Sequence, residues 1–238
     1  MVQLTHLNYA IRLSLIAYNM IRYIVLGFPL FSLNLFGQSD PWKNVYTQSA
    51  WADRDQWQKA DELITQMRLK PGGTAADIGC HEGYMSIKLS KAVGATGKVF
   101  SVDVENDKLL KLKNNANDLN LKNITAIQGD YDNPKIPATI DAAIIIDTYH
   151  EMDDHDKILQ HIKTALRKGG RLVICEPIDD DRRNESRSTQ EGRHELGINF
   201  ALEDLKRAGF KIIRQQDPFV DREKIKGDKM WLIVAEKI

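Results

Sequence analysis

The stretch TAADIGCHEGYMS, residues 74–86, has the pattern of a buried strand that runs into a glycine-bounded turn and then into a helix. Gly79 and Gly83 enclose the turn, and His81 stands between them where a cofactor loop would be expected to carry a further glycine. In open α/β sheets, ligands bind at the carboxyl ends of the strands, near the point where the strand order reverses. The stretch therefore predicts an α/β fold with a ligand crevice beside this strand.

Strand-like and helix-like segments alternate along the following part of the chain. Strands are expected at residues 74–79, 98–104, 123–130, 140–150 and 171–178. Helices are expected between them at residues 84–93, 106–120 and 153–168. Such alternation predicts a parallel, doubly wound sheet, and the unbroken apolar run at 142–146 suits a strand that is buried on both faces.

The last part of the chain breaks this alternation. A helix is expected at 200–210, and two strands follow it at 211–219 and 230–238 with a loop but no helix between them. Two strands joined in this way pair antiparallel, because a parallel pair needs a long crossover. The chain is therefore expected to end in an antiparallel hairpin.

The segment before the first strand is expected to be a linker and a leading helix, over residues 39–69. Residues 39–58 are polar and aromatic, as in a linker, and apolar residues within 53–69 recur at helical spacing. The sequence KPGG at 70–73 predicts the turn that ends this helix. The catalytic or binding domain would then cover residues 70–238.

Residues 1–38 contain a hydrophobic segment of a different character. The apolar run from Tyr23 to Phe36 is shorter than the roughly twenty residues of a membrane span. It matches the apolar part of an export signal, and Met20 would make the better start because Arg22 would then supply the preceding charge. We expect a signal peptide or a membrane anchor at residues 20–38, and hence an exported or membrane-anchored protein with possible membrane association. The alternative is an amphipathic helix docked on a cytoplasmic domain.

Composition limits the classes of partner and of covalent structure. The chain has 33 basic and 33 acidic residues, so it has no global basic field that would attract nucleic acid, and no nucleic-acid partner is expected. Its two cysteines, Cys80 and Cys175, each end an apolar run and are interpreted as small buried hydrophobic residues. A disulfide framework is not expected.

The glycine turn argues against a dinucleotide. A dinucleotide fold needs G-x-G-x-x-G, because the backbone must approach a pyrophosphate closely. Here His81 occupies the second glycine position, and Gly83 comes one residue too early to be the third. A side chain at that point would crowd a pyrophosphate, which disfavours an NAD-dependent oxidoreductase. A ligand without phosphates would tolerate the change better.

Three acidic residues follow three successive strands. Asp77 precedes the glycine turn, where a carboxylate suits a cationic group such as an amino-acid ammonium. Asp103 ends the second strand, where an acid accepts hydrogen bonds from a ribose diol. Asp130 follows the third strand and could accept from an exocyclic amine such as that of adenine. Each acid alone could instead be a turn or helix cap, and their joint placement favours binding.

Five motifs in order make residues 70–238 resemble the class I S-adenosylmethionine-dependent methyltransferases. They are ADIGCHEG, which resembles D-x-G-x-G-x-G with the middle glycine replaced, VFSVDVEND, IQGDY, IDAAIIIDTYHEM and LRKGGRLVICEP. The terminal hairpin completes the Rossmann-like, seven-stranded, mostly parallel sheet typical of that fold. The runs DRDQWQKADELI and DTYHEM resemble a bacterial subgroup of small methyltransferases with poorly defined substrates.

The resemblance implies S-adenosyl-L-methionine as cofactor and a role for each matching position. It places Asp77 and the turn of Gly79, His81 and Gly83 beside the methionine part. It assigns the ribose to Asp103 with the neighbouring Val104, and the adenine to Asp130 with Tyr131. It places Asp147 and Thr148 over the cofactor, facing the acceptor, for which a small molecule is expected.

Two histidines are the candidates for catalysis. His150 follows the fourth strand in DTYHEM and could be a general base for a hydroxyl or a protonated amine; the alternative is that it caps a helix or bonds a carbonyl. His194, next to Glu195, lies in the charged segment 179–198, which is either a lid over the acceptor or a solvated loop.

No metal site is predicted. The region of Asp147, His150, Asp154 and His155 supplies suitable residue types, but their spacing matches no known cluster. The second function considered is a non-catalytic cofactor-binding or interaction module that keeps the fold, which the substitution at His81 and the export-like segment favour.

Overall fold

The computed structural model describes residues 45–238. The predicted signal or anchor at residues 20–38 lies outside the described residues. Among the helices of the described range, none combines the length and the apolar character that crossing a membrane requires.

Seven strands form one sheet in the order β3-β2-β1-β4-β5-β7-β6. The five parallel strands are β1 (Thr74–Ile78), β2 (Lys98–Asp103), β3 (Ile124–Gln128), β4 (Ile140–Ile146) and β5 (Leu166–Ile178). The last two strands, β6 (Phe210–Arg222) and β7 (Asp228–Lys237), pair antiparallel, and β7 also pairs antiparallel with β5. The predicted doubly wound sheet with an antiparallel C-terminal hairpin is confirmed.

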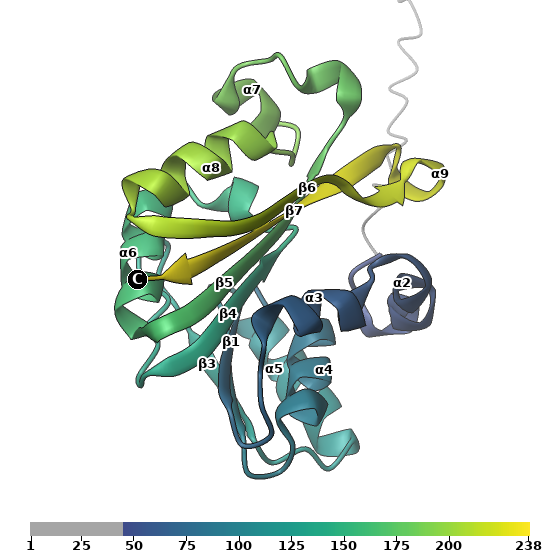
Figure 1. Ribbon diagram of the computed structural model, residues 1–238. Coiled ribbons are helices and arrows are strands. Elements are labelled where there is room, and N and C mark those ends of the chain that lie inside the picture. The colour runs from purple at the N-terminus through teal and green to yellow at the C-terminus, as the bar shows by residue number, and fades with distance from the viewer. Residues whose placement is uncertain (1–44) are drawn as a thin grey trace, which may run out of the picture. The chain divides into compact units, whose positions relative to one another are not determined.

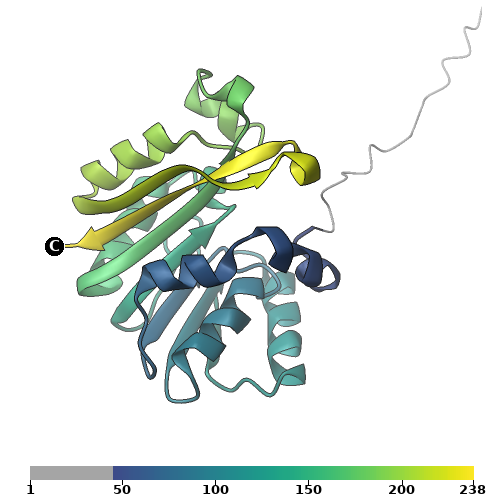
Figure 2. The same cartoon turned by 45° about the vertical axis from the view of Figure 1, so that its right-hand side comes forward.

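Helices cover both faces of this sheet (Figure 1, Figure 2). One face carries α3 (Ala60–Met67), α4 (Tyr84–Val93) and α5 (Asn106–Asp118), and the other carries α6 (His155–Ala165) and α8 (Ile198–Arg207). Strand β4 shows how the faces are divided. Ala143 and Ile145 belong to the apolar cluster with α6 and α8, whereas Ala142, Ile144 and Ile146 belong to the cluster with α3 and α4. Alternating side chains of one buried strand therefore build both halves of the core.

The leading segment differs from its prediction. The expected single helix at 53–69 is two helices, α2 (Trp51–Trp57) and α3, so part of the expected linker is helical. The chain breaks at Lys59, whose φ of 51° lies in the left-handed region. There Lys59 Nζ donates a hydrogen bond to the carbonyl of Phe219 at 2.7 Å. This contact with the C-terminal hairpin accompanies the break and could not be read from local spacing.

The junction of α6 and β5 also lies earlier than predicted. Helix α6 ends at Ala165, and Leu166 is already extended and paired with Ile140 of β4. The carbonyl of Leu166 accepts a hydrogen bond from Lys237 Nζ at 2.6 Å. Pairing with the neighbouring strand thus replaces the last predicted helical residues.

The charged segment 179–198 is folded around one buried amide. It contains a 3-10 turn, η3 (Asp180–Arg182), and a short helix, α7 (Arg187–Glu191). Gln190 is fully buried, its Nε2 donates to the carbonyls of Arg182 and Glu185 at 2.9 and 3.2 Å, and its Oε1 accepts from Gly197 N at 2.7 Å. The segment therefore has a defined path from β5 to α8.

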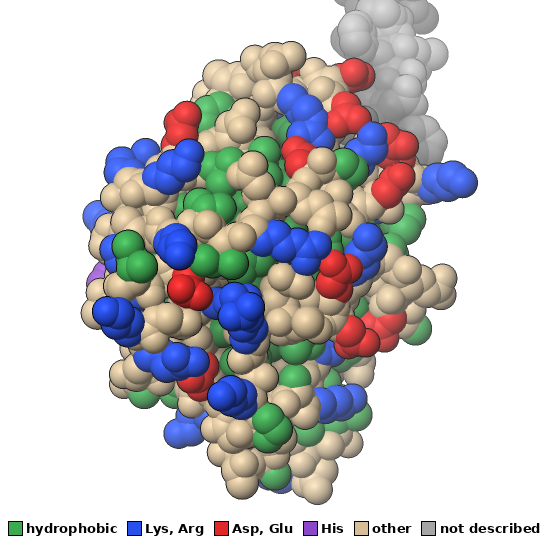
Figure 3. All heavy atoms as spheres, viewed as in Figure 1, with side chains coloured by type: hydrophobic (Ala, Val, Ile, Leu, Met, Phe, Trp, Pro, Cys, Tyr) green, Lys and Arg blue, Asp and Glu red, His purple; other side chains and the backbone are tan. Residues whose placement is uncertain are grey.

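Charged side chains are distributed without a single-sign stripe on the face shown in Figure 3. Lys and Arg are scattered over most of this face, and Asp and Glu gather toward its upper right. This face agrees with the equal numbers of basic and acidic residues in the sequence.

Candidate functional site

Asp77 lies at the carboxyl end of β1, on the edge where all five parallel strands end. Its side chain is 3% exposed and accepts a hydrogen bond from Ser86 Oγ of α4 at 2.6 Å. Burial raises the pKa of Asp77 to about 6. A buried carboxylate of this kind is stabilised in its charged form by a cationic ligand group.

Three alternate residues of the glycine turn after β1 have a positive φ: Gly79 (74°), His81 (49°) and Gly83 (98°). A Cβ on Gly79 would lie 2.2 Å from Cγ2 of Thr148, so glycine is required there. His81 thus has a backbone conformation that favours glycine. Such a conformation is uncommon for a residue with a side chain.

The His81 backbone, rather than its ring, connects the turn to β2. Its N–H donates a hydrogen bond to Asp103 Oδ2 at 2.8 Å. The imidazole lies edge-on to the ring of Tyr46, with centroids 6.4 Å apart, and burial lowers its pKa. Within residues 45–238 the buried Nδ1 of His81 has no hydrogen-bond partner. The ring is thus a neutral group in a largely apolar setting.

Asp103 and Asp130 have different surroundings. Asp103 accepts from the amides of His81 and Glu105, at 2.8 and 3.0 Å, and no Lys or Arg of the described residues forms an ion pair with it. Asp130 is exposed and forms an ion pair with Lys135 at 2.6 Å. Tyr131 beside it is 77% exposed. The acids of β1 and β2 therefore share the turn, whereas the predicted adenine-side pair faces solvent.

Val104, the predicted cofactor residue directly after β2, is partly buried, and its carbonyl accepts from Gln128 Nε2 at 3.1 Å. This contact joins the ends of β2 and β3. The predicted roles of the cofactor residues stay predictions.

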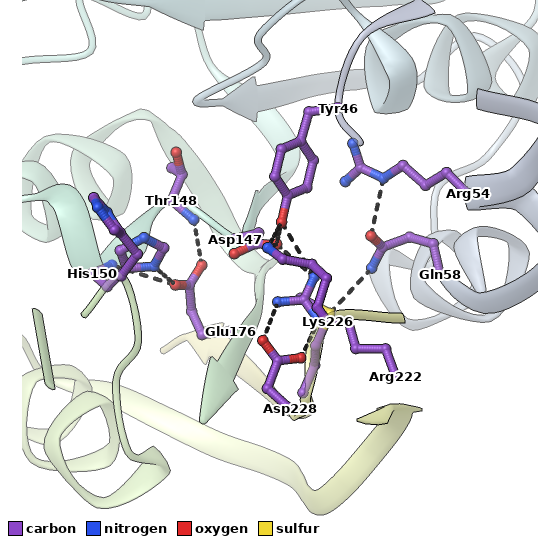
Figure 4. Close-up of polar contacts among 12 residues, drawn as sticks. Tyr46, Arg54, Gln58, Asp147, Thr148, His150, Glu176, Arg222, Lys226 and Asp228 are labelled. Atoms are coloured by element: carbon purple, nitrogen blue, oxygen red, sulfur yellow. Dashed lines mark hydrogen bonds and ion pairs between the residues drawn. The ribbon is translucent and has the colours of Figure 1, made fainter. Parts of the chain in front are cut away.

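Asp147, directly after β4, is held by cations rather than open to the crevice (Figure 4). Its Oδ2 accepts from Arg222 Nη1 at 2.7 Å and from the hydroxyl of Tyr46, and Lys226 Nζ lies 3.8 Å away. Arg222 is fully buried and also bonds Asp228 through two nitrogens. Although burial acts to raise it, Arg222 and Lys226 hold the pKa of Asp147 well below its usual value. The structure thus assigns this carboxylate to a buried ion network.

Glu176 organises the turn that follows β4. This carboxylate of β5 is 0% exposed. Its Oε1 accepts from the amides of Thr148 and Tyr149 at 2.7 and 3.0 Å. Its Oε2 lies 2.6 Å from Nδ1 of His150 and 3.3 Å from the amide of the same residue (Figure 4). One buried side chain therefore fixes both the backbone of the turn and the orientation of the His150 ring.

The two predicted catalytic histidines meet at Glu151. Oε1 of Glu151 lies 3.3 Å from His150 Nε2 and 2.5 Å from His194 Nδ1. The two imidazole rings are 5.9 Å apart and edge-on. Although burial acts to lower it, Glu176 and Glu151 raise the pKa of His150 to about 10. This environment favours an imidazolium, which has no lone pair for a proton, and the role of general base stays a prediction.

Arg54 of α2 is a further buried cation at this edge, which the sequence analysis did not single out. Its guanidinium lies over the rings of Tyr84 and Tyr46, 4.2 and 5.2 Å from their centroids, and Nε donates to Gln58 at 3.0 Å. Burial lowers the pKa of Arg54, and in turn Arg54 stabilises the charged form of Asp77. No carboxylate of the described range forms an ion pair with it.

Three further residues of the site were not predicted from the sequence, and only one of them had a local pattern that could have indicated it. Glu176 had one, because it is an acid inside the otherwise apolar run 172–178. Arg222 and Tyr46 had none, since they lie 75 and 101 residues from Asp147 in the chain.

A family model described as "Methyltransferase domain" matches residues 69–217. A demethylmenaquinone methyltransferase of Oceanobacillus iheyensis is 30% identical over 121 residues, which are 50% of this chain and 50% of that protein. The chain thus spans about half the length of the curated relatives that it matches first.

Solved structures of the same fold have lower identity. A SAM-dependent methyltransferase from Aquifex aeolicus superposes with a TM-score of 0.65 and 22% identity, covering 79% of this chain and 93% of that one. The [4+2]-cyclase SpnF superposes with a TM-score of 0.63 and 17% identity, covering 76% and 80%. At these identities the likeness shows the fold.

Proposed function

Since the chain belongs to the methyltransferase domain family, we propose that it transfers a methyl group from S-adenosyl-L-methionine to a small-molecule acceptor. The observation that carries the proposal is the pair of carboxylates, Asp77 and Asp103, on either side of the turn that begins α4. Both lie at the carboxyl edge of a parallel sheet, where such folds bind ligands. The cofactor supplies an electrophilic methyl group on a sulfonium, and the chain holds and orients it.

The amino-acid end of this cofactor fits two oppositely charged groups of the chain. The Asp77 carboxylate suits the ammonium, and Arg54, which no carboxylate of the described residues neutralises, suits the carboxylate. A buried pair of this kind gains from a zwitterion, because each buried charge then has a partner. Asp103 would accept from the ribose hydroxyls while its other contacts hold the turn.

The replaced glycine is compatible with this ligand. His81 presents a neutral ring whose buried Nδ1 bonds no residue of the range 45–238, and its backbone has a positive φ, as glycine tolerates. A pyrophosphate would need close backbone approach at this position, whereas a nucleoside sulfonium has no phosphate. The turn therefore supports S-adenosyl-L-methionine over NAD.

A small acceptor is supported by charge and by one relative. Equal numbers of basic and acidic residues, and a face without a basic stripe, give no electrostatic footprint for nucleic acid (Figure 3). The similar protein of Oceanobacillus iheyensis is named for demethylmenaquinone. Quinols and related hydroxylated small molecules are therefore the first acceptors to test.

A non-catalytic or differently reacting module is the second candidate. The likeness to the [4+2]-cyclase SpnF supports only the differently reacting alternative, because a protein of the same fold is there named for another reaction. The proposed export signal or anchor at residues 20–38, which N-terminal sequencing from the native host would test, favours it too. An intact Met1 in a soluble fraction would contradict export.

Calorimetric titration with S-adenosylhomocysteine and with NAD tests the proposal. We expect saturable micromolar binding of S-adenosylhomocysteine and none of NAD. Asp103→Ala should weaken binding by about 1–3 kcal/mol, because a polar ligand group loses a charged partner. Asp118→Ala, an exposed acid at the end of α5, is the matched control. Turnover is then measured as S-adenosylhomocysteine release with quinols, phenols and amines.

Two other results of these measurements would contradict the proposal. If neither ligand binds, the cofactor assignment is wrong. Cofactor binding without turnover on the whole panel would favour the non-catalytic module.

A further inference from the structure

Three potential metal ligands gather on the turn after β4 and in the segment that follows α7. They are His150, Glu151 and His194, and their ligand atoms all lie within 4.8 Å of one another. Glu151 Oε1 is the central atom, 3.3 Å from His150 Nε2 and 2.5 Å from His194 Nδ1. The sequence could not show this group, because 43 residues separate Glu151 from His194.

A second and independent feature is the carboxylate behind His150. Glu176 is fully buried, and its Oε2 lies 2.6 Å from His150 Nδ1. Ligating histidines usually donate their other ring nitrogen to a carboxylate or carbonyl, which fixes the tautomer and aims the ligand nitrogen outward. Backbone amides of Thr148 and Tyr149 hold Glu176 in turn. The Nε2 atom of His150 is therefore aimed at Glu151 by a fixed support.

The three ligand side chains differ in solvent exposure. The side chain of His150 is 3% exposed, whereas those of Glu151 and His194 are 55% and 75% exposed. An ion here would rest on one fixed ligand and keep positions open to water or to an oxygen ligand. The carboxylates of Glu151 and Glu176 match the charge of a divalent ion.

We propose that His150, Glu151 and His194 bind one divalent first-row transition-metal ion, which replaces the proton on Nε2 of His150, with Glu176 as a positioning residue. Two imidazoles and one carboxylate suit Zn²⁺, Mn²⁺, Fe²⁺ and Co²⁺ rather than Ca²⁺ or Mg²⁺, which prefer oxygen ligands. The site goes beyond the proposed methyl transfer and does not depend on it.

The other group of potential ligands lacks these properties. His155, Asp156 and Asp204 also lie close together. However, Asp204 already forms ion pairs with Arg187 and Arg207, at 2.8 and 2.7 Å. Its charge is balanced by arginines, so we assign no ion to it.

Titration of the untagged full-length chain with Co²⁺, followed by visible absorption, tests the site. We expect one saturable equivalent with ligand-field bands and without a thiolate charge-transfer band, because the ligands include no cysteine. His194→Ala and Glu151→Gln should each raise the Kd at least tenfold. His161→Ala and Glu185→Gln, exposed residues of the same types, are the matched controls and should leave the Kd unchanged.

Thermal unfolding gives a second readout. Zn²⁺ should raise the Tm of the native chain and of both controls, since a ligand of the folded state stabilises it, and should not raise that of His194→Ala. Absence of saturable Co²⁺ binding in the native chain would overturn the proposal. The proposal would also be overturned if His194→Ala and His161→Ala bound Co²⁺ with the same Kd, whether or not that Kd differs from the native value.

Discussion

His81 combines an unusual backbone conformation with a ring whose Nδ1 has no hydrogen-bond partner among the described residues. Its φ of 49° lies in a region that glycine adopts more readily than residues with a side chain, while its amide makes the hydrogen bond to Asp103. The amide is present whatever the side chain is. The ring and the backbone of this residue can therefore be tested apart.

His81→Gly should leave the affinity for S-adenosylhomocysteine within about threefold of the native value, because the bond from the amide to Asp103 remains. The measurement is calorimetric titration of both chains under one condition. A tenfold loss would instead show that the ring itself contacts the ligand.

Asp77 should make ligand affinity depend on pH. The pKa of Asp77 in the folded chain is about 6, above the ordinary value of 3.8. Ionisation of Asp77 therefore lowers the stability of the folded chain. This loss of stability is absent below pH 3.8 and complete above about pH 6. A ligand ammonium pairs only with the ionised form. We expect affinity for S-adenosylhomocysteine to rise between pH 5 and pH 7.

Asp77→Asn is the control for this pH dependence, since an amide does not titrate there. It should bind weakly and lose the rise in affinity between pH 5 and pH 7. An unchanged pH profile in this variant would assign the titration to another group.

At the scale of elements, the turn after β1 and the turn after β4 are packed directly against each other. The position of a Cβ on Gly79 falls 2.2 Å from Cγ2 and 2.8 Å from Cβ of Thr148. Thr148 is held in turn by Glu176 of β5. Three neighbouring strands therefore determine the space around the glycine.

Gly79→Ala should lower the free energy of unfolding by about 1–3 kcal/mol, as overpacking does, with further strain from φ 74°. Chemical denaturation gives the value. Thr148→Gly in the same chain should restore part of the loss, because it removes the clashing atoms but not the strain. A double variant no more stable than Gly79→Ala would refute the contact as the cause.

At the scale of the whole molecule, Arg222 joins parts that are distant in sequence. It bonds Asp147 after β4 and Asp228 of β7 (Figure 4). Its guanidinium also lies 5.5 Å from the ring centroid of Trp57 in α2. One buried guanidinium thus contacts the C-terminal hairpin, the turn after the central strand β4 and the leading helix α2.

Arg222→Met should lower the free energy of unfolding by about 3–5 kcal/mol, because two buried carboxylates lose their main partner. Arg167→Met, which breaks an exposed pair with Asp141, should change it by less than about 1 kcal/mol. Urea denaturation of both variants at neutral pH measures the difference. Equal effects would mean that the buried network adds little to stability.

Much of the fold followed from local patterns. Helix α4 covers residues 84–93 as predicted, because its apolar residues recur at helical spacing between Gly83 and Gly94. The apolar run of β4 predicted a strand buried on both faces, which is confirmed. The shared edge of Asp77 and Asp103 also followed, since parallel strands end on the same side.

The sequence by itself determined the alternation of strands and helices from β1 to β5, the antiparallel end of the sheet and the edge where the acids meet. Only the tertiary structure decided which side chains meet there: Asp147 with Arg222, His150 with Glu176, and Glu151 with His194. The reason is physical. Helix and strand periodicity reflect contacts a few residues apart, whereas these pairs join the turn after β4 to β5, to the end of β6 and to the segment between β5 and α8. Such long-range contacts leave no local pattern.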